Sequence, residues 1–209
     1  MPEYMTIAGK ATAEIEEKKS RFIAQLSHVE TEEEALAFLE EIRAEHRMAR
    51  HNVYAYILRG EGASERIRYS DDGEPQKTAG LPTLQALQHA GLTDVAVVVT
   101  RYFGGTLLGT GGLVRAYTAA AGGALQNAEL VSMRLVVDCR LRVPYAQFEQ
   151  AQRIIAAAGA KPEEPVFDDA VTLLWRMPAG EEGPLCAKLT ELTRGSAEVT
   201  VSAAMYAPF

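Results

Sequence analysis

The feature that most constrains the fold is a glycine-rich segment between a buried strand and a helix. Residues 95–100 form a continuous apolar, β-branched run, which is typical of a strand covered on both faces. Five glycines in nine residues follow, and a small-residue helix is expected over residues 112–128. Glycine permits backbone conformations that other residues avoid, so this pattern predicts a tight strand–turn–helix junction in a domain that mixes helices and strands.

Hydrophobic periodicity and capping signals predict the elements that precede this junction. A Thr31–Glu34 capping box begins an amphipathic helix, and Pro82 and Gly91 mark the start and the end of another. The expected β-structure is two extended stretches within residues 5–29 around a turn at 16–20, then a hairpin of residues 53–59 and 65–70 with its loop at 60–64.

The pattern changes near residues 131–134, where a second domain is predicted to begin. Its expected order is strand 134–143, helix 145–158, a hairpin of about 161–166 and 169–177, helix 184–193 and strand 198–205. The order βαββαβ is the ferredoxin-like pattern. The predicted fold class is therefore α+β, with domains at residues 1–131 and 134–209.

Length and charge limit the classes of function. The 209 residues suffice for two small domains with real cores, and the net charge of −7 argues against broad, non-specific nucleic-acid binding. The acids are unevenly placed, since many lie around the first helix, whereas residues 95–128 contain no acid and two arginines, Arg101 and Arg115. A local cationic site is therefore compatible with an acidic chain.

Localisation and redox state follow from what the sequence lacks. No apolar run approaches the roughly 20 residues that span a bilayer, and the first residues carry glutamates in place of a signal-peptide pattern. We expect a cytoplasmic protein without a membrane partner. Cys139 and Cys186 lie in apolar patterns without metal-ligand spacing, which predicts buried, reduced cysteines.

The glycine-rich segment is the main candidate binding site. Converging backbone N–H groups and a helix N-terminus favour an anion, and Arg101 and Arg115 can supply a guanidinium on either side. The segment is not a Walker loop, because no Lys follows Gly109, nor a dinucleotide fingerprint, because Val114 takes the third glycine position. The alternative is a tight junction whose glycines serve packing. The five candidate glycines are Gly104, Gly105, Gly109, Gly111 and Gly112.

Two further segments contain candidate chemistry. His51, next to Arg50 at the start of a strand, can shuttle protons near neutral pH, although a solvated surface His is the commoner case. Three carboxylates, Asp71, Asp72 and Glu74, can hold Mg²⁺, the one candidate cofactor. A plain polar β-turn explains these carboxylates as well.

A short basic patch at residues 18–22 contains Lys19, Arg21 and an aromatic residue. Beside an anion-binding turn it would extend a track for a phosphate backbone. Alone, such a patch is usually a solvated strand edge.

These segments together resemble the YigZ/IMPACT family. The motifs are KSRF at 19–22, RHNVYAY at 50–56, SDDGEP at 70–75, TAG at 78–80, and RYFGG at 101–105 leading to GTGGLVRAY at 109–117. The resemblance implies an N-terminal domain like the second domain of ribosomal protein S5 and a C-terminal domain like the last domain of elongation factor G. One departure is Leu107–Leu108, where many relatives place a Lys that would contact phosphate.

The resemblance also bears on the partner. Eukaryotic relatives regulate translation initiation by competing for the activator of a stress-responsive kinase. They use an additional N-terminal domain that this sequence does not show, so that partner is not expected here. What the resemblance implies is binding of RNA, the ribosome or a translation factor.

Three functions remain open. In the first, a translation-associated protein grips RNA or a ribosomal surface through Lys19, Arg21, Arg50, Arg101 and Arg115. In the second, an enzyme acts on a phosphate-bearing small molecule, with His51 as base and a metal on the carboxylates. In the third, the acidic helix docks a protein. We favour the first over an enzyme, because no nucleophile–base pair can be read from the sequence.

Overall fold

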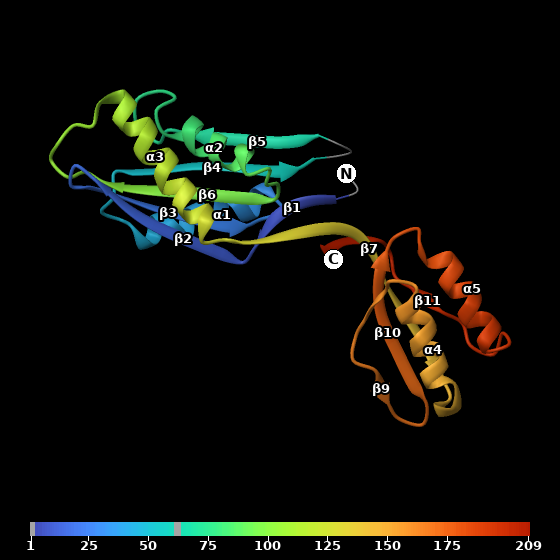
Figure 1. The fold of residues 1–209 in the computed structure, drawn as a ribbon. Helices are drawn as coiled ribbons and strands as arrows, with labels where there is room; N and C mark the ends of the chain where they lie inside the picture. The colour runs from blue at the N-terminus through green and yellow to red at the C-terminus, as the bar shows by residue number, and fades with distance from the viewer. Residues whose placement is uncertain (1–2, 61–63) are drawn as a thin grey trace. The chain divides into compact units, whose positions relative to one another are not determined.

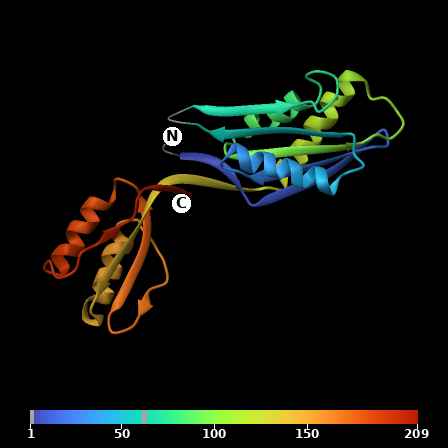
Figure 2. The same cartoon turned by 180° about the vertical axis from the view of Figure 1, so that it is seen from behind.

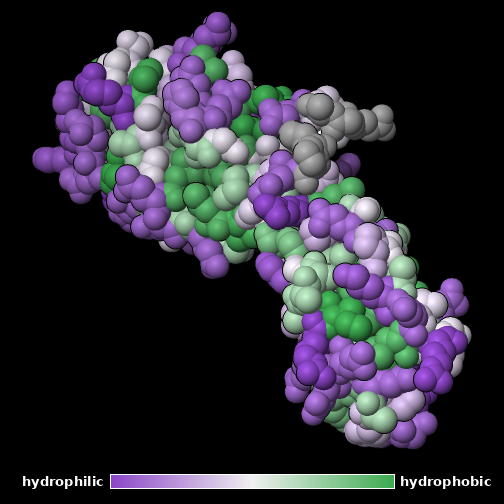
Figure 3. All heavy atoms as spheres, turned by 45° about the vertical axis from the view of Figure 1, so that its right-hand side comes forward, coloured by the Kyte–Doolittle hydropathy of each residue, from purple (hydrophilic) through white to green (hydrophobic). Residues whose placement is uncertain are grey.

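The computed structural model describes residues 3–60 and 64–209, which divide into two compact units, Glu3–Ser132 and Met133–Phe209. No helix in the described ranges is long and apolar enough to cross a membrane. In the view of Figure 3, the first unit shows a broad hydrophobic area and the second a smaller one, each bordered by hydrophilic side chains.

The first unit is built on a five-stranded antiparallel sheet with the order β2-β3-β6-β4-β5. Helix α1 covers one face of the sheet, and α2 and α3 cover the other (Figures 1 and 2). The elements are β1 (Glu3–Ala8), β2 (Lys10–Glu17), β3 (Ser20–His28), α1 (Glu32–Glu45), β4 (His51–Arg59), β5 (Glu65–Ser70), α2 (Gly80–His89), β6 (Val95–Tyr102) and α3 (Gly109–Gln126).

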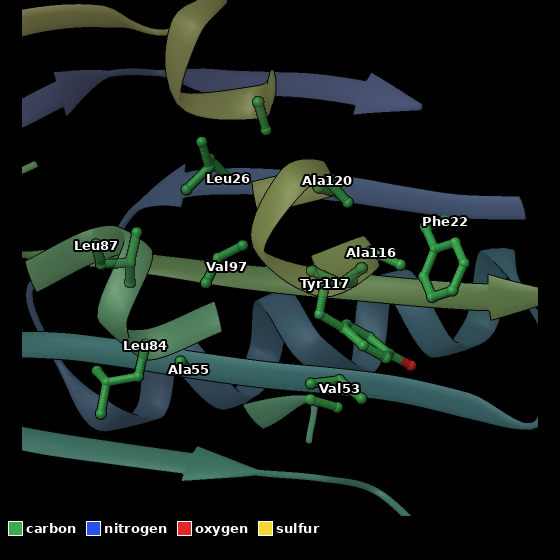
Figure 4. Close-up of a cluster of buried hydrophobic side chains, with 14 of the residues drawn as sticks. Phe22, Leu26, Val53, Ala55, Leu84, Leu87, Val97, Ala116, Tyr117 and Ala120 are labelled. Atoms are coloured by element: carbon green, nitrogen blue, oxygen red, sulfur yellow. The ribbon is translucent and has the colours of Figure 1, made fainter. Parts of the chain in front are cut away.

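The central strand β6 is buried because helices lie on both of its faces. Val95, Val97 and Val99 pack with α2 and α3, while Ala96 and Val98 pack under α1. Figure 4 shows the first of these cores, where Val97 lies among side chains from neighbouring strands and from the two helices. The predicted buried strand is confirmed, although its neighbours run antiparallel to it.

The helix boundaries follow local signals. The capping box is confirmed, because Thr31 Oγ1 accepts from Glu34 N at 3.2 Å and Glu34 Oε2 accepts from Thr31 N at 3.3 Å. Helix α2 begins two residues before Pro82, and Gly91 follows it with a φ of +66°. Helix α3 begins at Gly109 rather than at residue 112, so three of the candidate glycines lie in its first turn.

The N-terminal strands differ from the predicted pattern, whereas the first hairpin matches it. Residues 5–29 form parts of three strands instead of two stretches, because Gly9, with a φ of +67°, separates β1 from β2. The predicted hairpin of β4 and β5 is present, with Ile57 opposite Ile67. Its loop at 60–64 lies mostly on residues 61–63, outside the described residues.

The second unit has the ferredoxin-like order of strands and helices. Strand β10 (Val171–Pro178) pairs antiparallel with β7 (Glu129–Val143), and Trp175 is buried in the core beneath the helices. The last predicted strand is two short strands that both pair with β7. The other elements are α4 (Tyr145–Ala157), β8 (Lys161–Pro162), β9 (Val166–Phe167), α5 (Glu182–Leu192), β11 (Thr200–Val201) and β12 (Met205–Pro208).

Candidate functional site

A cavity of about 460 Å³ lies where the glycine-rich segment leaves β6. The antiparallel register of β4 and β6 places His51 opposite Arg101, and the turn before α2 adds Glu74. The start of α3 closes another side. Three segments that are distant in the sequence therefore meet here. The lining residues are Arg50, His51, Glu74, Pro75, Arg101, Phe103, Leu107, Leu108, Gly109, Thr110 and Leu113.

Arg101 and Glu74 form a buried ion pair in the wall of this cavity. Arg101 Nη1 donates to Glu74 Oε1 at 2.6 Å, and the two side chains are 7% and 4% exposed. The hydroxyl of Tyr117 on α3 donates to the same oxygen at 2.9 Å. Burial, and then the charge of Glu74, raise the pKa of Tyr117, so this phenol stays a hydrogen-bond donor.

This ion pair corrects the role expected for Arg101. Sequence reasoning assigned its guanidinium to an external anion, whereas its charge is balanced by Glu74 within the protein. The guanidinium also lies 5.4 Å from the ring centroid of Phe22 and 5.7 Å from that of Phe103. Arg101 is therefore a structural part of the cavity wall, and its Nε is buried without a hydrogen-bond partner among the described residues.

Ser20 holds the beginning of the glycine-rich segment. Its buried Oγ accepts from Gly104 N at 3.1 Å and lies 3.5 Å from Arg101 Nη2, which also donates to it. A Cβ at Gly104 would lie 2.0 Å from the carbonyl carbon of Lys19. Gly104 thus serves close backbone approach, as the packing alternative supposed, and its amide is occupied within the protein. Gly105 has a φ of +84°.

The three candidate metal ligands do not converge. Asp71 Oδ1 accepts from the amides of Ala79 and Gly80 at 3.1 and 2.8 Å, and its Oδ2 accepts from Lys77 N at 2.8 Å. Asp72 Oδ2 accepts from Asn52 N at 2.6 Å.

Asp72 Oδ1 accepts from Arg43 Nη2 at 3.2 Å, and Glu74 pairs with Arg101. Residues 3–60 and 64–209 contain no group of three His, Cys, Asp or Glu placed to hold a metal ion. The magnesium hypothesis does not fit these residues, because their carboxylates fix the turn before α2. The β-turn alternative agrees with the bond from Glu74 N to Asp71 O at 2.9 Å.

His51 is half-buried in the cavity wall. Its Nδ1 lies 2.8 Å from the carbonyl oxygen of Asp72, and because a carbonyl can only accept, Nδ1 carries the proton. In the neutral ring, Nε2 is then an acceptor. Across the described ranges, this bond to Asp72 is the only hydrogen bond of the His51 ring.

The other candidate cations differ in whether their charge is balanced. Arg21 is tied to Glu14, with Nε donating to Oε1 at 2.7 Å, and its charge is balanced on the surface. Arg50, Arg115 and Lys19 are exposed, and none has an ion-pair partner in the part of the chain that the structure describes. Sequence reasoning could not separate these two groups, since the difference depends on which acid the fold brings near.

The start of α3 completes the site. Its N-cap, Leu108, gives no side-chain hydrogen bond, and the first turn contains no acid. Arg115 folds back over this turn, with Nη1 3.5 Å from the position of a Cβ on Gly111. The amides of Gly109, Thr110 and Gly111 at this helix N-terminus therefore add positive potential beside Arg115.

Two functional features were missed from the sequence. Phe103 is 53% exposed and lines the cavity, although its position in the glycine-rich motif was the only hint. Tyr117 was read as part of a helix, and nothing in the helical pattern showed that its hydroxyl would reach Glu74. Exposed Leu107, at 83%, also lines the cavity.

Comparison with known proteins agrees with this architecture. The Impact N-terminal domain matches residues 18–125, and a domain of unknown function (DUF1949) matches residues 141–196. The IMPACT family member YigZ of Escherichia coli is 36% identical over 95% of this chain and 98% of its own length. A protein IMPACT homolog of Dictyostelium discoideum is 37% identical over 46% of this chain and 28% of its own.

Among solved structures, the crystal structure of a hypothetical protein superposes with a TM-score of 0.65. It is 35% identical and covers 97% of this chain and 98% of its own. The fold described above is therefore shared with an experimentally determined relative.

Proposed function

Because this chain belongs to the IMPACT family, we propose that it is a translation-associated regulatory protein that binds RNA, either free or within the ribosome. The proposal places the protein in the cytoplasm, where translation takes place. The observation that carries it is a cationic and aromatic surface around the cavity, on a chain whose net charge is −7.

The cations of this surface are Arg50 in the cavity wall, Arg115 beside the first turn of α3, and Lys19, whose backbone lies against Gly104. Each is exposed and lacks an ion-pair partner within the described ranges, so each is available to a phosphate. The N-terminus of α3 adds backbone amides that favour the same charge. Arg101 and Arg21, which sequence reasoning included, are excluded from this set because carboxylates already balance them.

An aromatic ring beside these cations favours RNA over an isolated anion. Phe103 presents an exposed face next to Arg50 in the cavity wall. Proteins that bind single strands combine a basic track for the backbone with aromatic faces on which bases stack. Specific recognition of RNA also falls mostly on unpaired bases, because the major groove of an RNA helix is too deep and narrow to read.

The test is the salt dependence of binding to a labelled 12-nucleotide single-stranded RNA, measured by fluorescence anisotropy. Each phosphate contact contributes about 0.7 to the slope of log affinity against log salt. Arg50→Ala and Arg115→Ala should each weaken binding and reduce that slope by about 0.7. Arg153→Ala, an exposed arginine on α4 without an ion-pair partner in the described part of the chain, is the matched control.

Two results would reject the proposal. One is affinity for RNA that does not change with salt. The other is an equal loss for Arg153→Ala and the two site variants, which would indicate binding through total charge rather than through this surface.

A further inference from the structure

Building on the proposed function, we propose that the cavity receives one unpaired, amino-bearing base of the bound RNA. In this arrangement the base enters the cavity, its ring stacks on Phe103, and its phosphate lies at Arg50 and the start of α3. The chain would then read a single nucleotide in addition to the charge of the strand.

The size and the walls of the cavity suit a base. Its volume of about 460 Å³ lies in the range of pockets that hold small organic ligands. Apolar walls come from Pro75, Leu108 and Leu113, and Phe103 supplies an exposed ring. Such a lining excludes water from the two faces of a flat aromatic ligand. The burial of these faces is the main source of stacking energy.

Two acceptor atoms in the wall are left for a ligand, beside the cations Arg50 and Arg101. Glu74 is 9% exposed, and only its Oε1 accepts hydrogen bonds from the described residues, namely from Arg101 and Tyr117. Its Oε2 therefore remains open to a donor from a ligand. In the neutral ring, His51 Nε2 is also an acceptor, because Nδ1 donates to Asp72 O. Hydrogen bonds to a charged acceptor are stronger than those between neutral groups, so the cavity favours a ligand that brings an N–H group.

This acceptor pattern discriminates between bases. Adenine, cytosine and guanine each carry an exocyclic amino group that can donate to Glu74 Oε2. Uracil carries no amino group, and its ring N–H lies between two carbonyl oxygens that would face the carboxylate. The cavity is therefore expected to prefer an amino-bearing base to uracil.

The groups at the rim of the cavity can bind the phosphate of the same nucleotide. Gly109 and Thr110 line the cavity and belong to the uncapped first turn of α3, a helix of 18 residues. Arg50 lines the cavity and has no ion-pair partner in the described ranges. The same cavity therefore offers acceptor atoms to the base and positively charged groups to the phosphate. A base within a duplex cannot enter without leaving its stack, so an unpaired nucleotide is the fitting ligand.

The experiment compares 12-nucleotide RNAs that differ at one central position in a uridine background. We expect RNAs with central adenosine or cytidine to bind about tenfold tighter than RNA with central uridine, which lacks the amino donor, or with an abasic site, which lacks both the donor and the stacking ring. Two variants should abolish this difference in affinity. Phe103→Ala removes the stacking ring, and Thr110→Trp fills the cavity from an exposed position. Phe167→Ala, an equally exposed aromatic at 56% in the second unit, should preserve it.

The outcomes separate this inference from the proposed function. Salt-dependent binding that is equal for adenosine, uridine and abasic RNAs would overturn the base site and leave the cationic surface intact. A complete lack of RNA binding would overturn both. Displacement of the RNA by free adenosine monophosphate at equal concentration would show that the cavity takes free nucleotides, and this result would also overturn the RNA base as its ligand.

Discussion

The Arg101–Glu74 pair gives the most quantitative prediction. Arg101→Ala removes the guanidinium and leaves the Glu74 carboxylate, 4% exposed, with the Tyr117 hydroxyl as its one remaining donor among the described residues. Breaking a buried ion pair from one side costs about 3–5 kcal/mol, because the remaining charge stays desolvated. With an m value of about 2 kcal/mol per molar urea, the unfolding midpoint of the first unit should fall by about 2 M.

The chain contains its own reference for this measurement. Its one tryptophan, Trp175, is buried in the second unit, so its fluorescence reports the unfolding of that unit. Circular dichroism reports both units. Arg101→Ala should shift the transition seen by circular dichroism and leave the fluorescence midpoint in place.

A surface pair serves as the matched control. Arg21 and Glu14 are about half exposed, so Arg21→Ala should move the midpoint little. The double variant Glu74→Gln with Arg101→Ala should lose less than the sum of the two single variants. An Arg101→Ala midpoint no lower than that of Arg21→Ala would refute the reasoning that this pair is a buried structural element.

Other substitutions and one chemical test follow from local geometry. Gly104→Ala should destabilise the first unit strongly in urea denaturation, because a Cβ there would overlap neighbouring backbone. Gly122→Ala should instead stabilise this unit by about 1 kcal/mol, because a Cβ at this helical position meets open space. Thr31→Ala should cost about 1 kcal/mol in the same assay, through loss of the helix cap. Burial raises the pKa of Cys139 to about 11. Below that pH its thiol should therefore react with iodoacetamide more slowly than the thiol of the more exposed Cys186, and mass spectrometry would measure the two rates. Equal rates would contradict this prediction.

Local sequence signals were sufficient for most elements of the fold. The Thr31 cap, the glycine after α2 and the apolar run of β6 each act within a few residues, and the structure confirms them. The start of α3 was placed three residues late, because its glycine-rich first turn resembles a loop in composition. The break at Gly9 was missed because both flanking stretches are extended.

The site was harder to predict, because its chemistry depends on contacts between distant segments. Arg101 lies 27 positions from Glu74 and 81 from Ser20, and no pattern in the sequence pairs them. The fold brings Arg50, His51, Glu74 and the glycine-rich segment to one cavity. Which of their charges are balanced within the protein, and which are left for a partner, could be decided only from the coordinates.

The most direct test of the account is ultraviolet crosslinking of the full chain to single-stranded RNA, followed by mass spectrometry of the crosslinked peptides. The account predicts crosslinks at Phe103 and in the peptides that contain Arg50 and the start of α3. Crosslinks confined to residues 133–209 would contradict it, since RNA would then bind the second unit and the cavity would have another purpose.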